Sequence, residues 1–528
     1  MREDLLVFVK QAGISLDGQP FSFKGHEYLV EPYAEIRRNR EVIFEKAAQM
    51  GLSTLELLNT FHGSRYGFYP HGVLYLLPSK TDVTEFSKSK AQSIIDENPM
   101  IRSWILDTDA ANIKKIGTAW LYFRGMQSRI GLKTITVDMI VFDEIEEVED
   151  WSLVALAEER MSHIENPTVH RLSVPSIPGY GIDAYFSGSE DAGIRSSDQR
   201  YWLIKCEGCN EWNCLEDEFP DCIVEVNAKA EKAVRVCKKC GRELNIANGQ
   251  WVPKEPDRSV IGYHFSQLFS RFVNPWKILD QFRKKKDITT LFHDKLGIPY
   301  VDAESRLEVK DMSALETMDH QLNGLTGPCG MGVDQPKEEG GKFHVVIGYR
   351  TNTQPCNIIR ICIRNTWNEI RDLMNQYNVG RCVVDGQPDQ AKAREFAKAF
   401  LGRVFLCYYS DKQKGAAKWN ENDWTVSVDR TESLNSSTRA VHEQKISLPR
   451  LDDDVKLFER QCHNIARKKE EDKDSGSVRQ VWVKTGPDHY RHAFNYLYLA
   501  LPVVGEYYPP RPEWEKQRRR RPRSWKTI

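Results

Sequence analysis

A short stretch in the first half of the chain constrains its fold more than any other feature. Ile140, Val141 and Phe142 are large apolar residues, and two acids, Asp143 and Glu144, follow them directly. Such a run is typical of a buried strand in a parallel sheet, and it carries both carboxylates to the carboxyl edge of that sheet. Many ordinary strands also end in acids, so the pattern indicates a function only if a phosphate-binding loop precedes it.

A candidate phosphate loop does precede it. The apolar run 42–45 predicts a strand, residues 46–54 predict a loop, and residues 55–59 predict the beginning of a helix. In this context backbone N–H groups at a helix N-terminus hold phosphate, a lysine contacts the phosphate, and a hydroxyl contacts Mg²⁺. The alternative is a plain strand-to-helix turn.

The loop departs from the usual pattern in one respect. Gly51, Ser53 and Thr54 stand in their usual places, but Leu52 occupies the position of the lysine. Lys46 stands at the first loop position, which is normally a glycine, and from there its side chain can swing over the same phosphates. We therefore predict that Lys46, Gly51, Ser53 and Thr54 bind ATP.

Other residues of the first half complete this predicted site. Asp143 would hold Mg²⁺ through water, and Glu144 would orient and deprotonate the attacking water. Arg124 or Arg129 precedes the acidic strand and is a candidate finger for the nucleotide of a neighbouring subunit, although a solvated arginine is the more common case. Ser173 lies near the end of a further predicted strand, where loss of the γ-phosphate can be sensed.

These motifs, in this order, resemble the large terminase subunit of tailed bacteriophages. The likeness rests on a lysine-first phosphate loop, an apolar strand ending in Asp-Glu, and a Ser-x-Pro segment at residues 173–175. The displaced lysine is similar to the GpA-type branch of that family. The resemblance covers residues 28–501 and implies an α/β chain in which a P-loop ATPase motor is followed by an RNase H-like nuclease.

Cysteine spacing predicts a metal site between the two halves. The chain has 12 cysteines, and four of them form two CxxC pairs: Cys206, Cys209, Cys237 and Cys240. Four thiolates at this spacing suit tetrahedral Zn²⁺ in a structural role, because a closed site leaves no open position for chemistry. Cys214 and Cys222 are the alternatives if one ligand is misassigned. The resembled family commonly carries a zinc ribbon at this place.

Three acids in the second half match the nuclease positions of the resembled family. Asp334 lies on the first strand of a predicted hairpin, Asp385 ends a later strand, and Asp488 precedes an apolar helical stripe. Such acids converge on two Mg²⁺ or Mn²⁺ ions in phosphodiester hydrolysis, although each one alone is more often a strand end or a helix cap. His489 is a further candidate for this metal site, and Asp389 or His492 is the alternative to it. Residues 428–432 are expected to form a strand beside the site.

The predicted domain plan follows from these motifs: an ATPase domain at 1–305 with a zinc ribbon inserted at about 201–250, a linker at 306–325, a nuclease domain at 326–505, and a basic tail at 506–528. The tail is too charged to pack, and it either contacts DNA phosphate or an acidic partner or is merely solvated. No apolar run reaches membrane-spanning length, and the first residues do not begin a signal peptide, so no membrane is expected.

The resemblance implies a DNA-packaging motor with ATP, Mg²⁺ or Mn²⁺, and Zn²⁺ as cofactors. It would drive double-stranded DNA into a procapsid and cut concatemers, as a homo-oligomeric ring on the portal protein, with a small terminase subunit, in the host cytoplasm. One alternative is a repair helicase-nuclease, but we find no convincing helicase motifs after residue 250. The other is a non-catalytic zinc-ribbon DNA-binding protein with a decayed phosphate loop, for which Leu52 is the best argument.

Overall fold

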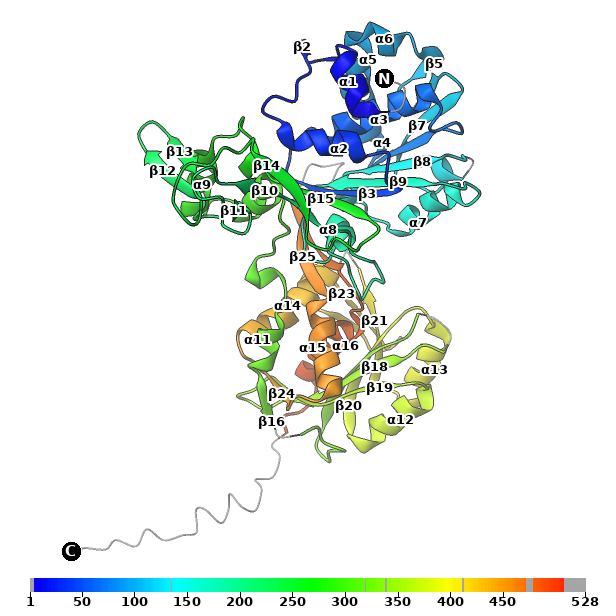
Figure 1. The fold of residues 1–528 in the computed structure, drawn as a ribbon. Coiled ribbons are helices and arrows are strands. Elements are labelled where there is room, and N and C mark those ends of the chain that lie inside the picture. The colour runs from blue at the N-terminus through cyan, green and yellow to red at the C-terminus, as the bar shows by residue number, and fades with distance from the viewer. Residues whose placement is uncertain are drawn as a thin grey trace, which may run out of the picture. The chain divides into compact units, whose positions relative to one another are not determined.

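The structure is a computed structural model that describes residues 4–133, 135–318, 320–337, 340–410, 413–471 and 478–507. The basic run 518–523 lies outside the described residues. The chain divides into two compact units, Met1–Val301 and Asp302–Ile528, and each is built on one large sheet (Figure 1). Within the described part of the chain, no helix has the length and apolarity needed to span a bilayer.

The first unit contains an 11-stranded sheet whose central strands run parallel. In spatial order the parallel strands are β10 (Arg200–Lys205), β15 (Ile261–Phe265), β3 (Glu41–Lys46), β9 (Thr168–Ser173), β8 (Met139–Asp143), β4 (Val73–Leu77) and β7 (Ala119–Gly125). Antiparallel strands extend its edges: β6 (Ile113–Ile116) and β5 (Ile105–Ala110) follow β7, and β11 (Trp212–Asn213) and β14 (Gly249–Pro253) pair with β10.

Helices cover both faces of this sheet, and its central strands β4 and β8 are therefore buried along their whole length. Alternate residues of β3 show the division, since Val42 and Phe44 belong to one core and Ile43 to the other. The first core is formed with α1 (Leu5–Gln11), α2 (Val30–Glu35), α3 (Leu52–Tyr66), α4 (Lys80–Phe86), α5 (Gln92–Glu97), α6 (Pro99–Arg102) and α9 (Pro275–Arg283). The second is formed with α7 (Ser152–Glu158) and α8 (Gly181–Phe186).

Smaller elements complete the first unit. The strands β1 (Ser15–Leu16) and β2 (Gln19–Pro20) form a small hairpin between α1 and α2. The hairpin of β12 (Ile223–Asn227) and β13 (Lys232–Arg235) packs against α9. The helix α10 (Ile288–Thr290) is a single short turn.

The second unit contains a nine-stranded mixed sheet. Its spatial order is β16 (Glu316–Met318), β24 (Ile446–Pro449), β19 (Cys356–Arg364), β18 (Phe343–Tyr349), β17 (Cys329–Asp334), β20 (Val379–Asp385), β21 (Val404–Tyr409), β23 (Thr425–Val428) and β22 (Lys418–Asn420). The strands β17, β18 and β19 form an antiparallel meander, whereas β20 and β21 continue parallel to β17. A separate ribbon consists of β25 (Ile465–Glu471) and β26 (Val478–Lys484).

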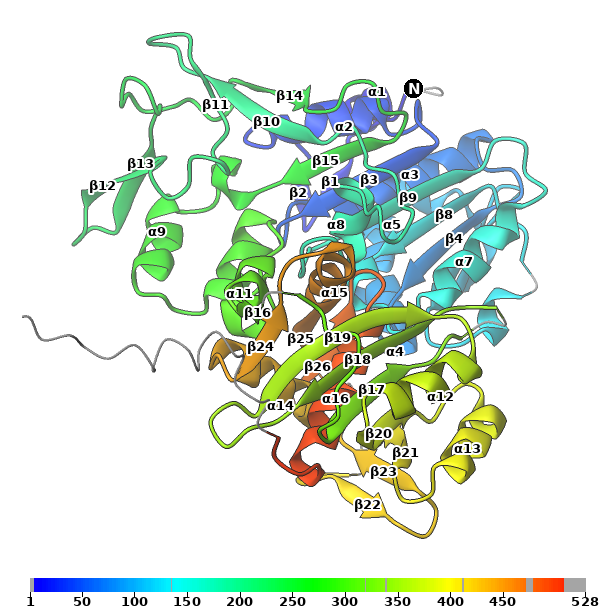
Figure 2. The same cartoon turned by 90° about the horizontal axis from the view of Figure 1, so that it is seen from below.

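Two groups of helices pack on opposite faces of this second sheet (Figure 2). One group is α12 (Trp367–Gln376) and α13 (Gln390–Ala399). The other is α11 (Val309–Ser313), α14 (Arg430–His442), α15 (Asp453–His463) and α16 (His489–Ala500). The elements α11 and β16 are formed by residues of the segment expected as a linker.

The expectation of a strand at residues 428–432 is wrong. The strand β23 ends at Val428, and the helix α14 begins at Arg430. Asp429 lies between them with an extended backbone, and its side chain accepts a hydrogen bond from the backbone N–H of Glu432 at 2.9 Å. This is an N-cap, and it satisfies an amide of the first helical turn that has no partner within the helix.

The alternation of side chains along β17 decides which way Asp334 points. Met331 and Val333 belong to the core beneath α12 and α13. Gly330 and Gly332 face α16, and a Cβ at Gly332 would overlap the carbonyl oxygen of Ala493 in that helix. Because residues at i and i+2 share a face of a strand, Asp334 lies on the α16 side of the sheet.

Candidate functional site

The strand order of the first unit brings the predicted nucleotide residues together. The strand β9 lies between β3 and β8, and all three run parallel. Their carboxyl ends are Lys46, Ser173 and Asp143, which therefore meet at one edge of the sheet. In open α/β sheets ligands bind at the carboxyl ends of the strands.

A partly buried ion pair joins two residues of the predicted nucleotide site, Lys46 and Glu144. Nζ of Lys46 donates a hydrogen bond to Oε1 of Glu144 at 2.7 Å, and the Lys46 side chain is only 6% exposed. Burial opposes the charge of Lys46, but Glu144 and Asp143 outweigh that effect and raise its pKa. Burial likewise opposes the charge of Glu144, and Lys46 outweighs it and lowers the pKa of that carboxyl. Both groups are therefore charged at neutral pH.

The backbone and a serine fix the position of Glu144. Its φ is 56° and its ψ is 46°, a left-handed conformation that residues other than glycine seldom adopt. Its backbone N–H donates to the carbonyl of Leu172 at 2.9 Å, and the hydroxyl of Ser173 donates to Oε2 of Glu144 at 3.1 Å. Ser173 also accepts a hydrogen bond from the backbone N–H of Glu146 at 3.3 Å, so it connects β9 to the segment after β8.

Asp143 has the environment that a hydrated cation requires. Its side chain is buried, and the hydroxyl of Tyr75 donates to Oδ2 at 2.7 Å. Oδ1 is also buried but has no hydrogen-bond partner among the described residues. Burial, followed by the neighbouring Glu144, raises the pKa of Asp143 to about 6. An unpaired buried carboxylate oxygen calls for a partner, and Mg²⁺ with its water shell fits this position.

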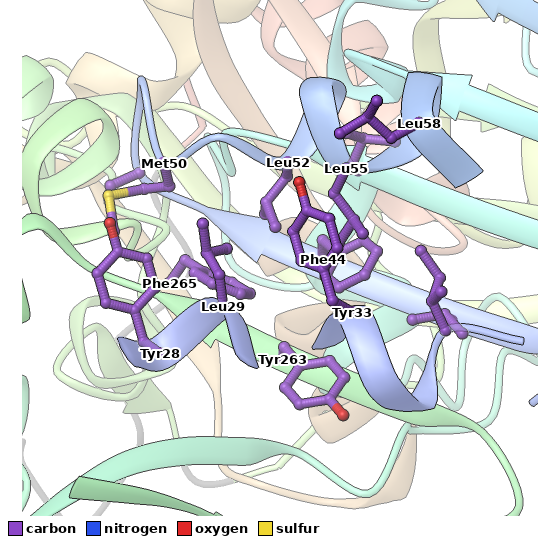
Figure 3. Close-up of a cluster of buried hydrophobic side chains, with 14 of the residues drawn as sticks. Tyr28, Leu29, Tyr33, Phe44, Met50, Leu52, Leu55, Leu58, Tyr263 and Phe265 are labelled. Atoms are coloured by element: carbon purple, nitrogen blue, oxygen red, sulfur yellow. The ribbon is translucent and has the colours of Figure 1, made fainter. Parts of the chain in front are cut away.

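Leu52 points into the core, away from the predicted phosphate position. Figure 3 shows it packed with Leu55 of the same helix and with Phe44 of β3. Gly51 precedes it with a φ of 87°, and α3 begins at Leu52. Ser53 and Thr54 lie in the first turn of α3, where backbone amides have no carbonyl of their own helix to bond. Lys46 is the one lysine in the loop of residues 46–54.

Residues not singled out in the sequence hold the loop in shape. The backbone N–H of Ala48 donates to the carbonyl of Asp294 at 2.9 Å, and Nε2 of Gln267 donates to the carbonyl of Ala48 at 2.9 Å. Gly297 has a φ of 70°, and a Cβ there would overlap the carbonyl oxygen of Phe265. These contacts come from residues more than two hundred positions away in sequence, so no local pattern indicates them.

The two candidate finger arginines differ in their surroundings. Nη1 of Arg124 donates to the carbonyls of Asn112 and Phe123, at 2.6 and 2.9 Å. Arg129 is exposed, and its Nη2 lies 3.4 Å from the hydroxyl of Ser152. Arg124 is thus held by its own chain, whereas Arg129 extends toward solvent.

The four predicted zinc ligands form one cluster. Their sulfurs all lie within 4.8 Å of one another, with Sγ separations of 3.6 Å for Cys206–Cys240 and for Cys209–Cys237. Amides of Gly208 and Cys209 lower the pKa of Cys206. The residues present fit a tetrahedral thiolate site.

The alternative cysteines lie elsewhere. Sγ of Cys214 donates to Oε2 of Glu216 at 3.5 Å, and Sγ of Cys222 donates to the carbonyl of Leu215 at 3.3 Å. Burial, the largest influence, raises the pKa of Cys222 to about 12, and it raises that of Cys214 further. Thiols in such surroundings remain protonated and are poor metal ligands.

In the second unit, Asp334 and Asp385 end the adjacent parallel strands β17 and β20. Burial, followed by the charge of Asp334, raises the pKa of Asp385 to about 6. Asp488 stands at the N-terminus of α16, with its Oδ2 3.2 Å from Nε2 of His492. Burial opposes its charge, but His492 outweighs burial and lowers the pKa of Asp488 to about 2.

Two histidines, His489 and His344, lie beside Asp334. Nδ1 of His489 lies 2.8 Å from Oδ2 of Asp334, and the rings of His489 and His344 stack with centroids 4.7 Å apart. Burial, and then His489, lowers the pKa of His344 to about 4. The sequence analysis did not include His344 among the site residues. The signal that could have found it is its position on the second strand of the predicted hairpin, because the hairpin register can place it opposite Asp334. Asp389, one sequence alternative, caps α13 and accepts from the backbone N–H of Lys392 at 3.1 Å.

Comparisons with known proteins agree with this architecture. Among solved structures, the HK97 bacteriophage large terminase superposes with a TM-score of 0.55 at 10% identity, covering 94% of this chain and 99% of that one. The large terminase of a thermophilic bacteriophage, in complex with ADP, gives a TM-score of 0.31 at 12% identity, covering 92% of this chain and 100% of that one. No curated protein sequence matches the chain. By the first of these matches, the fold is that of the phage large terminases.

The sequence identifies the branch. Residues 21–252 match the family described as "Phage terminase large subunit gpA, ATPase domain". Over this segment the chain matches the ATPase domain of the gpA-type phage terminase large subunits, and the resemblance found in the sequence is confirmed. The match spans the strands that carry Lys46, Asp143 and Ser173 and ends within β14.

Asp385→Asn should stabilise the protein in buffer without added divalent ions. The folded-state pKa lies near 6, above its ordinary value of 3.8, so ionisation costs stability once the pH exceeds that ordinary value. At pH 8 the substitution should raise the free energy of unfolding by about 1–3 kcal/mol, and this increase should shrink as the pH falls from 6 toward 4. Urea denaturation across this range measures it, with the exposed Asp372→Asn on α12 as a matched control. A gain independent of pH would contradict the explanation.

Proposed function

We propose that the chain is a DNA-packaging motor that hydrolyses ATP to drive double-stranded DNA into a procapsid and cuts concatemeric DNA with a metal-dependent nuclease. The observation that carries the motor is the cluster of Lys46, Glu144 and Ser173 beside the unpaired Oδ1 of Asp143. The ATPase family of residues 21–252 supports this assignment.

The ion pair suggests how the site would respond to nucleotide. In the structure Lys46 and Glu144 neutralise each other. A triphosphate offers Lys46 a stronger partner, so Lys46 leaves Glu144, and the freed carboxylate can orient water and accept its proton. Asp143 and the hydroxyl of Ser53 or Thr54 would hold Mg²⁺, which supplies charge neutralisation at the phosphates when bound.

Ser173 is placed to link movement of the Glu144 side chain to the segment after β8. It donates to Glu144 and accepts from the backbone of Glu146, so movement of the Glu144 side chain alters a hydrogen bond shared by β9 and the segment after β8. We assign it the coupling role. Of the candidate trans fingers, the exposed Arg129 is freer to reach a neighbouring subunit than Arg124, whose guanidinium is held by carbonyls of its own chain.

The nuclease assignment rests on strand order and charge. An antiparallel meander of three strands followed by two strands parallel to the first is the order of an RNase H-like sheet, and it supports that class for the second unit. Asp334 and Asp385 share its edge, and Asp488 begins the helix packed against β17. Such acids hold the Mg²⁺ or Mn²⁺ that activates water for phosphodiester hydrolysis.

The family also supports the proposed assembly. We assign as partners double-stranded DNA, the portal protein, a small terminase subunit, and further copies of this chain in a ring, acting in the host cytoplasm. The domain plan places the ATPase domain at 1–305 with the zinc ribbon at about 201–250, a linker at 306–325, the nuclease domain at 326–505 and the basic tail at 506–528.

ATP hydrolysis should depend on both members of the ion pair. Lys46→Ala and Glu144→Gln should each reduce kcat by about 100-fold or more, because one removes the phosphate contact and the other the base. Phosphate release by the full chain with Mg²⁺ measures this, and Lys254→Ala and Glu147→Gln serve as exposed controls. Hydrolysis indifferent to both substitutions would remove these residues from the site.

Plasmid cleavage should require Asp334. In Mg²⁺ or Mn²⁺ buffer, Asp334→Ala should lose cleavage by at least about 100-fold, since a metal-holding carboxylate is gone. Asp389→Asn keeps the cap of α13 and should cut like the wild type. Cleavage that survives in Asp334→Ala would place the nuclease elsewhere.

The full chain should bind one Zn²⁺ at the Cys206, Cys209, Cys237 and Cys240 cluster. Cys237→Ser should lower the zinc content from about one to near zero per chain, because a structural site needs all four ligands. Metal analysis of the purified protein measures it. Cys222→Ala, the matched control, should keep its zinc; loss in the control but not in Cys237→Ser would reverse the assignment.

A further inference from the structure

We propose that His344 is a metal ligand that joins Asp334 and His489 in a site selective for first-row transition-metal ions over Mg²⁺. The inference rests on the proposed nuclease function and deepens it. The three acids predicted from the sequence offer only oxygen to a metal. His344 adds a nitrogen donor that changes which ion the site accepts.

The sheet register places His344 beside Asp334. The strands β17 and β18 pair antiparallel with Asp334 directly opposite His344. Directly paired residues have Cβ atoms about 5 Å apart on the same face of the sheet. That face is covered by α16, whose first residue is His489. Backbone geometry alone therefore gathers one carboxylate and two imidazoles at one point.

The side chains converge within coordination range. One ligand atom from each of Asp334, His344 and His489 lies within 4.8 Å of the other two. Among the described residues this is the only such group besides the four cysteines. Nδ1 of His489 already lies 2.8 Å from Asp334, so an ion could take the place of the proton that they share.

One atom of His344 lacks a partner. Its side chain is buried, with a residue exposure of 7%, and Nδ1 has no hydrogen bond among the described residues. An unsatisfied buried nitrogen is destabilising, and structures seldom retain one without a role. The ring is held in place by stacking on His489 and by an edge contact with Tyr490 at 4.8 Å. Packing thus orients the imidazole, and no hydrogen bond from a described residue engages its Nδ1.

The donor set decides between ions. Mg²⁺ prefers six oxygen ligands and retains several waters, so a site with two imidazoles suits it poorly. Imidazole nitrogen favours first-row transition ions, and among them Mn²⁺ binds most weakly. Mn²⁺ is therefore the most demanding probe of the site, and its thiolate affinity is low enough to leave the zinc cluster undisturbed.

The test is a Mn²⁺ titration of the zinc-loaded full chain, with free Mn²⁺ followed by electron paramagnetic resonance and Mg²⁺ used as competitor. His344→Phe keeps the stacked ring and removes its nitrogens. We expect Mn²⁺ affinity to fall by about tenfold or more, while Mg²⁺ affinity changes by less than about twofold. His442→Gln removes an exposed histidine at the end of α14 and should bind as the wild type does.

A second readout needs no substitution. Electron spin echo modulation of Mn²⁺ bound to the wild type should show coupling to two imidazole nitrogens, and one or none would overturn the proposal. Unchanged Mn²⁺ affinity in His344→Phe would also overturn it. If Asp334→Asn abolishes binding but His344→Phe does not, only this inference fails. If the wild type binds no Mn²⁺ that depends on Asp334, the proposed nuclease fails with it.

Discussion

Parallel pairing of neighbouring strands is the constraint on which both units depend. A parallel strand cannot turn back on its neighbour, so the chain crosses over through a helix and every strand ends at the same edge. In the first unit this edge gathers Lys46, Ser173 and Asp143, and in the second it gathers Asp334 and Asp385. The candidate site of each unit therefore lies where strands end, although its residues lie far apart in sequence.

Because these side chains lie together at a buried sheet edge, several of them are held where burial disfavours their charged forms. Lys46 is tolerated because Glu144 accepts its hydrogen bond, since a buried charge without a partner is strongly destabilising. At Asp143 and Asp385 burial outweighs the nearby cationic side chains, and the pKa of each carboxyl is raised. A bound cation would relieve both. The two units thus share one feature, a carboxylate destabilised by burial at the edge of the sheet.

Backbone features hold these groups in place. Glu144 is fixed by a left-handed backbone conformation and by Ser173, which limits the directions its carboxylate can take. Gly332 lets α16 approach β17 closely enough for His489 to contact Asp334. In each case a neighbouring residue, Ser173 or Gly332, determines the position of a residue in the candidate site. Rigid positioning of this kind makes a site effective.

The sequence by itself determined the local elements: the acidic strand before Glu144, the loop beginning at Lys46, the two CxxC turns and the acids of the second half. These follow from apolar runs and short spacings, which act within a few residues. Only the tertiary structure decided that Leu52 belongs to the core, that Tyr75 bonds Asp143, that residues 430–432 begin a helix behind the cap of Asp429, and that His344 faces Asp334. Strand order and register bring together residues with no relation along the chain, and no local pattern encodes which strands become neighbours.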